Sequence, residues 1–156
     1  MVILGIDPGT ARAGYGILEI NKQKYTLVDC DLLSKDAKTH TVRLFEIRKR
    51  LVQILKKYNP DKAVVETLFF TKNKKTGLLV AEARGVIIQT LVEFNIPIIE
   101  LTPNQIKLAV TGNGESSKAG IKKMLSLLLK TDFIKTVDDV TDAIAAAFAG
   151  SQNSLQ

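Results

Sequence analysis

Five acidic residues stand in or beside apolar stretches, where a carboxylate is costly unless something compensates its charge. Asp7 ends the stretch VILGID, and Glu66 lies within the stretch AVVETLFF. Asp138, Asp139 and Asp142 open an alanine-rich stretch near the end of the chain, VDDVTDAIAAAF. We therefore take these five carboxylates as the first candidates for chemistry.

The donor atoms of this set favour a hard divalent cation. Carboxylates that converge without a counter-charge repel one another and raise one another's pKa values, and a bound cation removes that conflict. Oxygen ligands without nitrogen or sulfur are typical of Mg²⁺ or Mn²⁺. Helix capping and the helix dipole would account for two of the three late aspartates, so acids with separate structural roles remain the alternative.

Basic and aromatic residues indicate a partner that carries phosphates. The chain has 22 Lys and Arg against 16 Asp and Glu, a formal net charge of +6, which favours nucleic acid. Five lysines are candidate phosphate contacts, although a solvated surface position is the alternative for each: Lys72, Lys74, Lys75, Lys107 and Lys118. Phe69 belongs to an aromatic pair before a basic loop and can stack on unpaired bases. An acidic site in a basic protein is typical of metal-assisted cleavage of a phosphodiester.

Other catalytic sites find little support in the sequence. The glycines from 9 to 14 imitate the spacing of a P-loop, but Tyr15 stands where that motif needs a lysine. His40, the single histidine, lies in a polar stretch typical of a solvated helix start. Cys30, the single cysteine, fits a half-buried packing position, and its isolation excludes an internal disulfide.

The candidate residues must be positioned by a mixture of strands and helices. Apolar stretches bounded by turn residues predict strands at 2–7, 14–20, 24–33, 62–70 and 96–101. Helical spacing of apolar residues predicts helices at 41–58, 78–94, 103–110, 118–130 and 137–148, with a lysine-rich loop at 71–77. This order predicts an α/β fold, with a five-stranded mixed sheet flanked by helices, in a single domain over residues 1–156.

The helix expected at 78–94 is apolar around most of its circumference. One face must cover the sheet. The other face is buried either against a second subunit or inside the same chain, and these two alternatives are equal. No apolar stretch is long enough to span a bilayer, and MVILGIDPGT lacks the features of a signal peptide. We therefore expect a cytoplasmic protein that does not associate with a membrane.

Five motifs, in chain order, resemble the RuvC family of Holliday-junction resolvases, which has an RNase H-like fold. GIDPGTARAGYGIL contains Asp7, and VVETLFFTKN contains Glu66 and Phe69. AEARGVI is similar to a segment of the family's long dimer helix. LTPNQIKLAVTGNGESSKAGI is similar to the family's lysine-bearing segment, and DVTDAIAAA to its closing D-x-x-D motif. The last motif fits Asp139 and Asp142 and leaves Asp138 as a first-turn or capping residue.

The resemblance implies a homodimer that binds four-way DNA junctions and nicks two symmetric strands, leaving 5′-phosphate and 3′-hydroxyl ends. It implies one site per subunit, in which Mg²⁺ is held by Asp7, Glu66, Asp139 and Asp142. It further implies that Lys107 and Lys118 hold the scissile phosphate and that Phe69 lies against bases at the junction centre. It leaves open whether a branch-migration motor is a partner.

Three departures from the family pattern concern DNA contacts rather than metal ligands. Thr67 and Glu82 stand where the family commonly has glutamine, and the loop at 115–117 is atypical. We therefore expect the choice among four-way junctions, three-way junctions and forks to be the variable property. Two alternatives remain, a related nuclease that cuts RNA or RNA–DNA hybrids and a non-catalytic binder of branched DNA. An ATP site of the sugar-kinase or actin type is a more distant one.

Overall fold

The computed structural model describes residues 1–9, 12–35, 37–67 and 74–152. The strands are β1 (Val2–Asp7), β2 (Gly14–Asn21), β3 (Lys24–Leu32), β4 (Lys62–Glu66) and β5 (Ile98–Leu101). The helices are α1 (His40–Tyr58), α2 (Lys74–Glu93), α3 (Pro103–Thr111), α4 (Lys118–Leu129) and α5 (Asp138–Gln152). No helix in these described ranges combines the length and apolarity needed to cross a membrane. The cytoplasmic location stays a prediction.

One mixed sheet with the strand order β3-β2-β1-β4-β5 forms the centre of the fold. β1, β2 and β3 form an antiparallel meander, whereas β4 and β5 run parallel to β1. The five-stranded mixed sheet flanked by helices is therefore confirmed. Because parallel strands end at the same edge of a sheet, the last residues of β1, β4 and β5 lie together.

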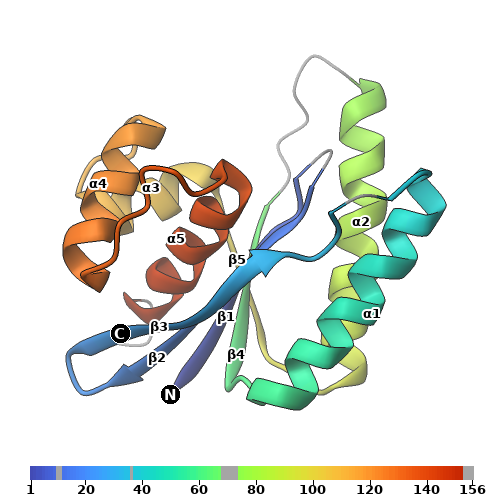
Figure 1. Cartoon of the computed structure of the whole chain (residues 1–156), viewed down its shortest axis with the longest axis horizontal. Coiled ribbons are helices and arrows are strands. Elements are labelled where there is room, and N and C mark those ends of the chain that lie inside the picture. The colour runs from blue at the N-terminus through green and yellow to red at the C-terminus, as the bar shows by residue number, and fades with distance from the viewer. Residues whose placement is uncertain (10–11, 36, 68–73, 153–156) are drawn as a thin grey trace.

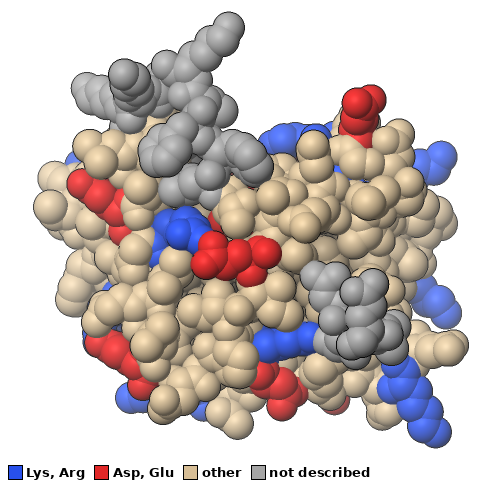
Figure 2. All heavy atoms as spheres, turned by 180° about the vertical axis from the view of Figure 1, so that it is seen from behind, with Lys and Arg blue, Asp and Glu red and all other residues tan. Residues whose placement is uncertain are grey.

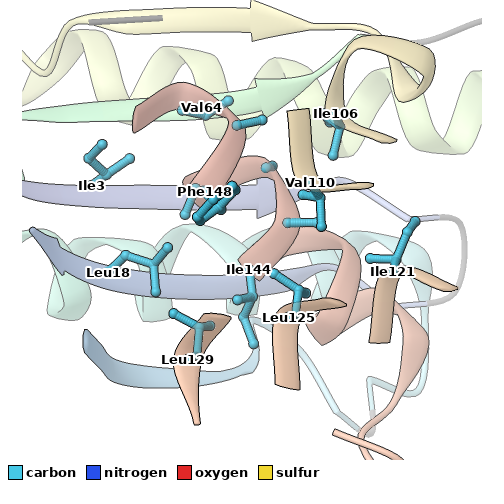
Figure 3. Close-up of a cluster of buried hydrophobic side chains, with 14 of the residues drawn as sticks. Ile3, Leu18, Val64, Ile106, Val110, Ile121, Leu125, Leu129, Ile144 and Phe148 are labelled. Atoms are coloured by element: carbon cyan, nitrogen blue, oxygen red, sulfur yellow. The ribbon is translucent and has the colours of Figure 1, made fainter. Parts of the chain in front are cut away.

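Helices cover both faces of the sheet (Figure 1). α1 and α2 pack on one face, and α3, α4 and α5 on the other. Under α1 and α2 the core is built from residues such as Leu4, Ile47 and Ile87. Under α5 it is built from residues such as Ile3 and Phe148, with α3 and α4 closing its outer side (Figure 3). The sheet that carries the ends of β1 and β4 is thus covered by helices on both faces.

Glycine and alanine let α5 approach β1 and β2 unusually closely. A Cβ atom added at Gly5 would lie 2.0 Å from the carbonyl oxygen of Ala143, and one at Gly14 would lie 2.1 Å from that of Asp139. Only glycine leaves room for this approach. Ala143 and Ala147 are fully buried at the contact, which explains why the last helix is rich in alanine.

Two predicted boundaries are wrong. β4 ends at Glu66, so Glu66 stands at the end of a strand rather than within one. α2 begins at Lys74, so Lys74 and Lys75 lie in its first turn and not in a loop. The polarity of the lysine-rich stretch predicts a loop. Lysine is nevertheless a good helix former, so the helix begins before its apolar spacing does.

Candidate active site

Asp7 and Glu66 end two adjacent parallel strands. The register pairs Ile6 with Val65, so the next residue of each strand, Asp7 and Glu66, stands at the same edge of the sheet. The turn that follows Asp7 contains Gly9, where an added Cβ would lie 2.7 Å from the Oδ1 atom of Asp139. The start of α5 therefore lies directly against the turn that follows β1.

The carboxylates of this edge share one electrostatic environment. Burial raises the pKa of Asp7 to about 8, and the negative charges of Glu66, Asp142 and Asp139 add to the shift. Burial also raises the pKa of Glu66 to about 7, with a further contribution from Asp142. The pKa of Asp142 is raised as well, again chiefly by burial. The tertiary structure thus brings together Asp7, Glu66, Asp139 and Asp142.

Two lysines line a small cavity together with two of these acids. The cavity has a volume of about 290 Å³, and its charged lining consists of Glu66, Lys107, Lys118 and Asp142. Lys107 comes from α3, where the capping box of Thr102 and Gln105 fixes the start of the helix. Lys118 is the first residue of α4, and its Nζ atom lies 3.5 Å from Oδ2 of Asp142. Both predicted lysines therefore reach the acidic edge.

Asp138 lies in the first turn of α5, as predicted, and its side chain contacts α4 rather than capping its own helix. Its carboxylate lies 3.2 Å from Nζ of Lys118 and 2.9 Å from Nζ of Lys122. Hydrogen bonds from Lys122 and then Lys118 lower the pKa of Asp138. Lys118 is therefore shared between Asp138 and Asp142, which lie one helical turn apart.

The donor set fits a hard divalent cation, although it is not a closed cage. In the described ranges, no three Asp, Glu, His or Cys side chains stand close enough together to surround an ion as placed. Burial is the largest cause of the raised pKa values of Asp7 and Glu66, and the negative charge of Asp142 raises both of them further. Oxygen ligands with an excess of negative charge are the environment that Mg²⁺ and Mn²⁺ require.

Three arginines near the site were not identified from the sequence. Arg84 of α2 donates from Nε to the carbonyl oxygen of Glu66 at 3.4 Å and pairs with Glu100. Arg12 lies 3.8 Å from Asp139, and its side chain is half exposed. Arg43 is buried behind the turn at Gly9. Its place on the apolar stripe of α1, four residues before Ile47, was a detectable signal, because a charged residue on a buried stripe requires a partner.

Several predicted DNA contacts cannot be located in the same way. Phe69 and Lys72 lie outside the described residues, and Lys74 and Lys75 are placed in α2 by their backbone alone. Their roles stay predictions. Seen from the side opposite to that of Figure 1, acidic and basic side chains gather near the middle of the face, amid uncharged surface (Figure 2).

The remaining singled-out residues have structural partners. His40 begins α1, as predicted, and its Nε2 atom lies 2.6 Å from Oε2 of Glu82 on α2. Cys30 is half-buried in β3, which confirms the packing interpretation. Thr67, next to Glu66, donates a backbone hydrogen bond to Leu101. Two of the three family departures, Thr67 and Glu82, thus tie neighbouring elements together.

Comparison with known proteins gives concordant matches. Residues 3–150 match the family model of crossover junction endodeoxyribonuclease RuvC. A crossover junction endodeoxyribonuclease RuvC of Petrotoga mobilis is 47% identical over 150 residues, covering 95% of this chain and 91% of the relative. A crossover junction endodeoxyribonuclease RuvC of Brachyspira hyodysenteriae is 43% identical over 157 residues, covering 99% of this chain and 97% of the relative. The structure of T. thermophilus RuvC in complex with a Holliday junction substrate matches with a TM-score of 0.90 at 24% identity, covering 99% of this chain and 94% of that one, which establishes the shared fold.

Proposed function

The chain belongs to the RuvC family of crossover junction endodeoxyribonucleases, and on that premise we propose that it resolves four-way DNA junctions by paired, metal-dependent nicks. The observation that carries the proposal is the cavity between the end of β4 and the helices α3, α4 and α5. Glu66 and Asp142 face Lys107 and Lys118 there, with Asp7 coupled to the same acids. Acids that can hold a cation thus lie within reach of lysines that can hold a phosphate.

We assign the cation as Mg²⁺, with Mn²⁺ as a substitute, held by Asp7, Glu66, Asp139 and Asp142. When bound, it supplies the activation of water and the stabilisation of the leaving oxygen. The protein's own groups bind and orient the DNA strand. Lys107 and Lys118 neutralise the scissile phosphate, and Asp138 helps to hold the Lys118 ammonium in place.

The exposed face of α2 supports a homodimer. Leu78, Gly85 and Val92 recur every seven residues, and Leu78 and Val92 are 59% and 61% exposed. Ala81 and Ile88 complete a heptad-like apolar stripe. A Cβ added at Gly85 would meet nothing within 4 Å, so a second helix can approach closely. Since Val80, Ala83 and Ile87 of the same helix are buried within the chain, α2 has one internal face and one face open to a second copy.

A dimer explains how two nicks can be paired. Each copy contributes one complete acidic site, because the four acids come from a single chain, and two copies related by a twofold axis present two sites to the symmetric strands of a junction. We propose that residues 1–156 form one nuclease domain. We also propose that Phe69 and Lys72, which follow β4 in the sequence, and Lys74 and Lys75, in the first turn of α2, contact the junction centre.

One experiment tests this function against its alternatives. The protein is incubated with Mg²⁺ and with matched four-way, three-way, linear duplex and RNA–DNA hybrid substrates, and the products are resolved by gel. We expect symmetric nicks in opposing strands of the four-way junction, with ends that a ligase can seal. The control is Asp7→Asn, which should bind the junction without cutting it. Preferential cutting of the hybrid would make the chain a different nuclease, and binding without cutting would make it a binding protein.

A further inference from the structure

Arg43 is a buried charged residue whose place in the fold is unexplained by packing. It lies on the inner stripe of α1 and is 6% exposed. One of its guanidinium nitrogens, Nη2, donates a hydrogen bond to the carbonyl oxygen of Gly9. Its Nε–H group has no hydrogen-bond partner among the described residues. Burial lowers the pKa of Arg43, whereas the charge of Asp139 acts in the opposite direction.

The contacts of Arg43 connect it to two of the four acids. Gly9 follows Asp7 by two residues, so the hydrogen bond to its carbonyl group fixes the turn that carries Asp7. The Cα atom of Gly9 in turn packs against the carboxylate of Asp139, since an added Cβ would lie 2.7 Å from its Oδ1 atom. Arg43 therefore supports the acidic edge from the side opposite to the cavity that Lys107 and Lys118 line.

This arrangement is a poor way to stabilise a fold. A buried guanidinium with an unsatisfied donor is costly, and an apolar side chain of similar length in the same place is often neutral or stabilising. Arg12, the other arginine near Asp139, lies 3.8 Å away at the surface, where screening makes the contact weak. Groups behind a metal site commonly orient its ligands, and such a role would explain a costly buried cation next to a cluster of acids.

From this geometry we infer that Arg43 is a positioning residue for the metal site, which holds the Asp7–Gly9 turn and the Asp139 carboxylate in the arrangement that binds the cation. The inference rests on the proposed metal-dependent nuclease function and concerns a residue outside the acidic and lysine motifs. It predicts that Arg43 contributes to metal affinity. It does not require Arg43 to contribute to the thermal stability of the metal-free protein.

The test compares Arg43→Met with wild type in a titration of Mn²⁺ followed by electron paramagnetic resonance, which counts bound ions without any cleavage. We expect the dissociation constant for Mn²⁺ to rise about 10–100-fold, the usual effect of removing a group that orients a metal ligand. Arg43→Lys keeps the charge and one donor toward Gly9 and should give an intermediate value. Nicking by Arg43→Met should recover as the Mg²⁺ concentration is raised.

Arg48→Met is the matched control, because Arg48 lies on the same helix and pairs with Glu93 at the surface, away from the acids. Its Mn²⁺ affinity should equal that of wild type. An Arg43→Met protein with unchanged Mn²⁺ affinity and a lower melting temperature would show a purely structural role and overturn the inference. Tighter Mn²⁺ binding would also overturn it, by showing that Arg43 only competes with the cation.

Two further outcomes are decided by the same measurements. If Arg43→Met does not fold, the Mn²⁺ affinity of Arg43→Lys decides the question by the same criterion. If wild type itself binds no Mn²⁺ and makes no Mg²⁺-dependent nicks, the proposed function fails. If wild type does both and the Arg43 variants match it, only the inference about Arg43 fails.

Discussion

Replacing Asp7 with asparagine should stabilise the metal-free protein while abolishing its activity. Asp7 is a buried carboxylate whose pKa is raised to about 8 by burial and by neighbouring acids. Because its pKa in the folded state is above its value of 3.8 in the unfolded chain, the folded state binds the proton more tightly. The stability contributed by this proton is complete below pH 4 and is lost as the pH rises through 8.

The size of the effect follows from the same two pKa values. Relative to acid conditions, ionisation of Asp7 lowers the free energy of unfolding by on the order of 5 kcal/mol at pH 8. At pH 5 the loss is about 1.5 kcal/mol. An asparagine at this position removes that cost but leaves a buried amide, which costs about 1–3 kcal/mol. The net gain at pH 8 is about 2–4 kcal/mol, or a rise in melting temperature of roughly 4–16 °C.

The assay is a set of thermal melts of wild type and Asp7→Asn in EDTA between pH 5 and pH 8. We expect the advantage of Asp7→Asn to shrink to nearly nothing at pH 5. Addition of Mg²⁺ at pH 8 should stabilise wild type and raise the melting temperature of Asp7→Asn much less, because the variant lacks one ligand. Equal melting temperatures at pH 8, or an advantage that does not change with pH, would refute the burial argument for Asp7.

Three other predictions concern the remaining site residues and the dimer. Asp139→Asn and Asp142→Asn should abolish Mg²⁺-dependent nicking in a gel assay. Asp138→Asn should keep most of the nicking activity and lose about 1 kcal/mol of stability at most, because the ion pairs of Asp138 are at the surface. An inactive Asp138→Asn beside an active Asp139→Asn would contradict the assignment. Lys118→Ala should slow cleavage roughly 100–1,000-fold with a smaller effect on junction binding in a mobility-shift assay, and equal losses of both would make Lys118 a simple binding contact. Leu78→Glu should convert a dimer of 17.1 kDa chains into monomers in analytical ultracentrifugation and remove paired nicking, and a persistent dimer would place the interface elsewhere.

The sequence was sufficient for the parts of the site that depend on local patterns. The stretch VILGID predicts a buried strand that ends at Asp7, and β1 has these bounds. The helical spacing of the late aspartates could not choose between Asp138 and Asp139 as partner of Asp142, since both lie within one turn of it. The motif resemblance made that choice, and it stays a prediction. In the structure Asp138 faces Lys118 and Lys122, whereas Asp139 lies against Gly9.

Only the tertiary structure decided how closely the acids approach one another and what supports them. Gly14 and Ala143 lie far apart in the chain, and their small size has no meaning until α5 is packed on β1 and β2. The place of Arg43 on the apolar stripe of α1 indicates that it needs a partner, but only the folded chain shows that this partner is the carbonyl oxygen of Gly9. Local sequence patterns indicate which residues will be buried. The identity of the partner depends on contacts between segments separated by tens of residues, and these are determined by the packing of the whole core.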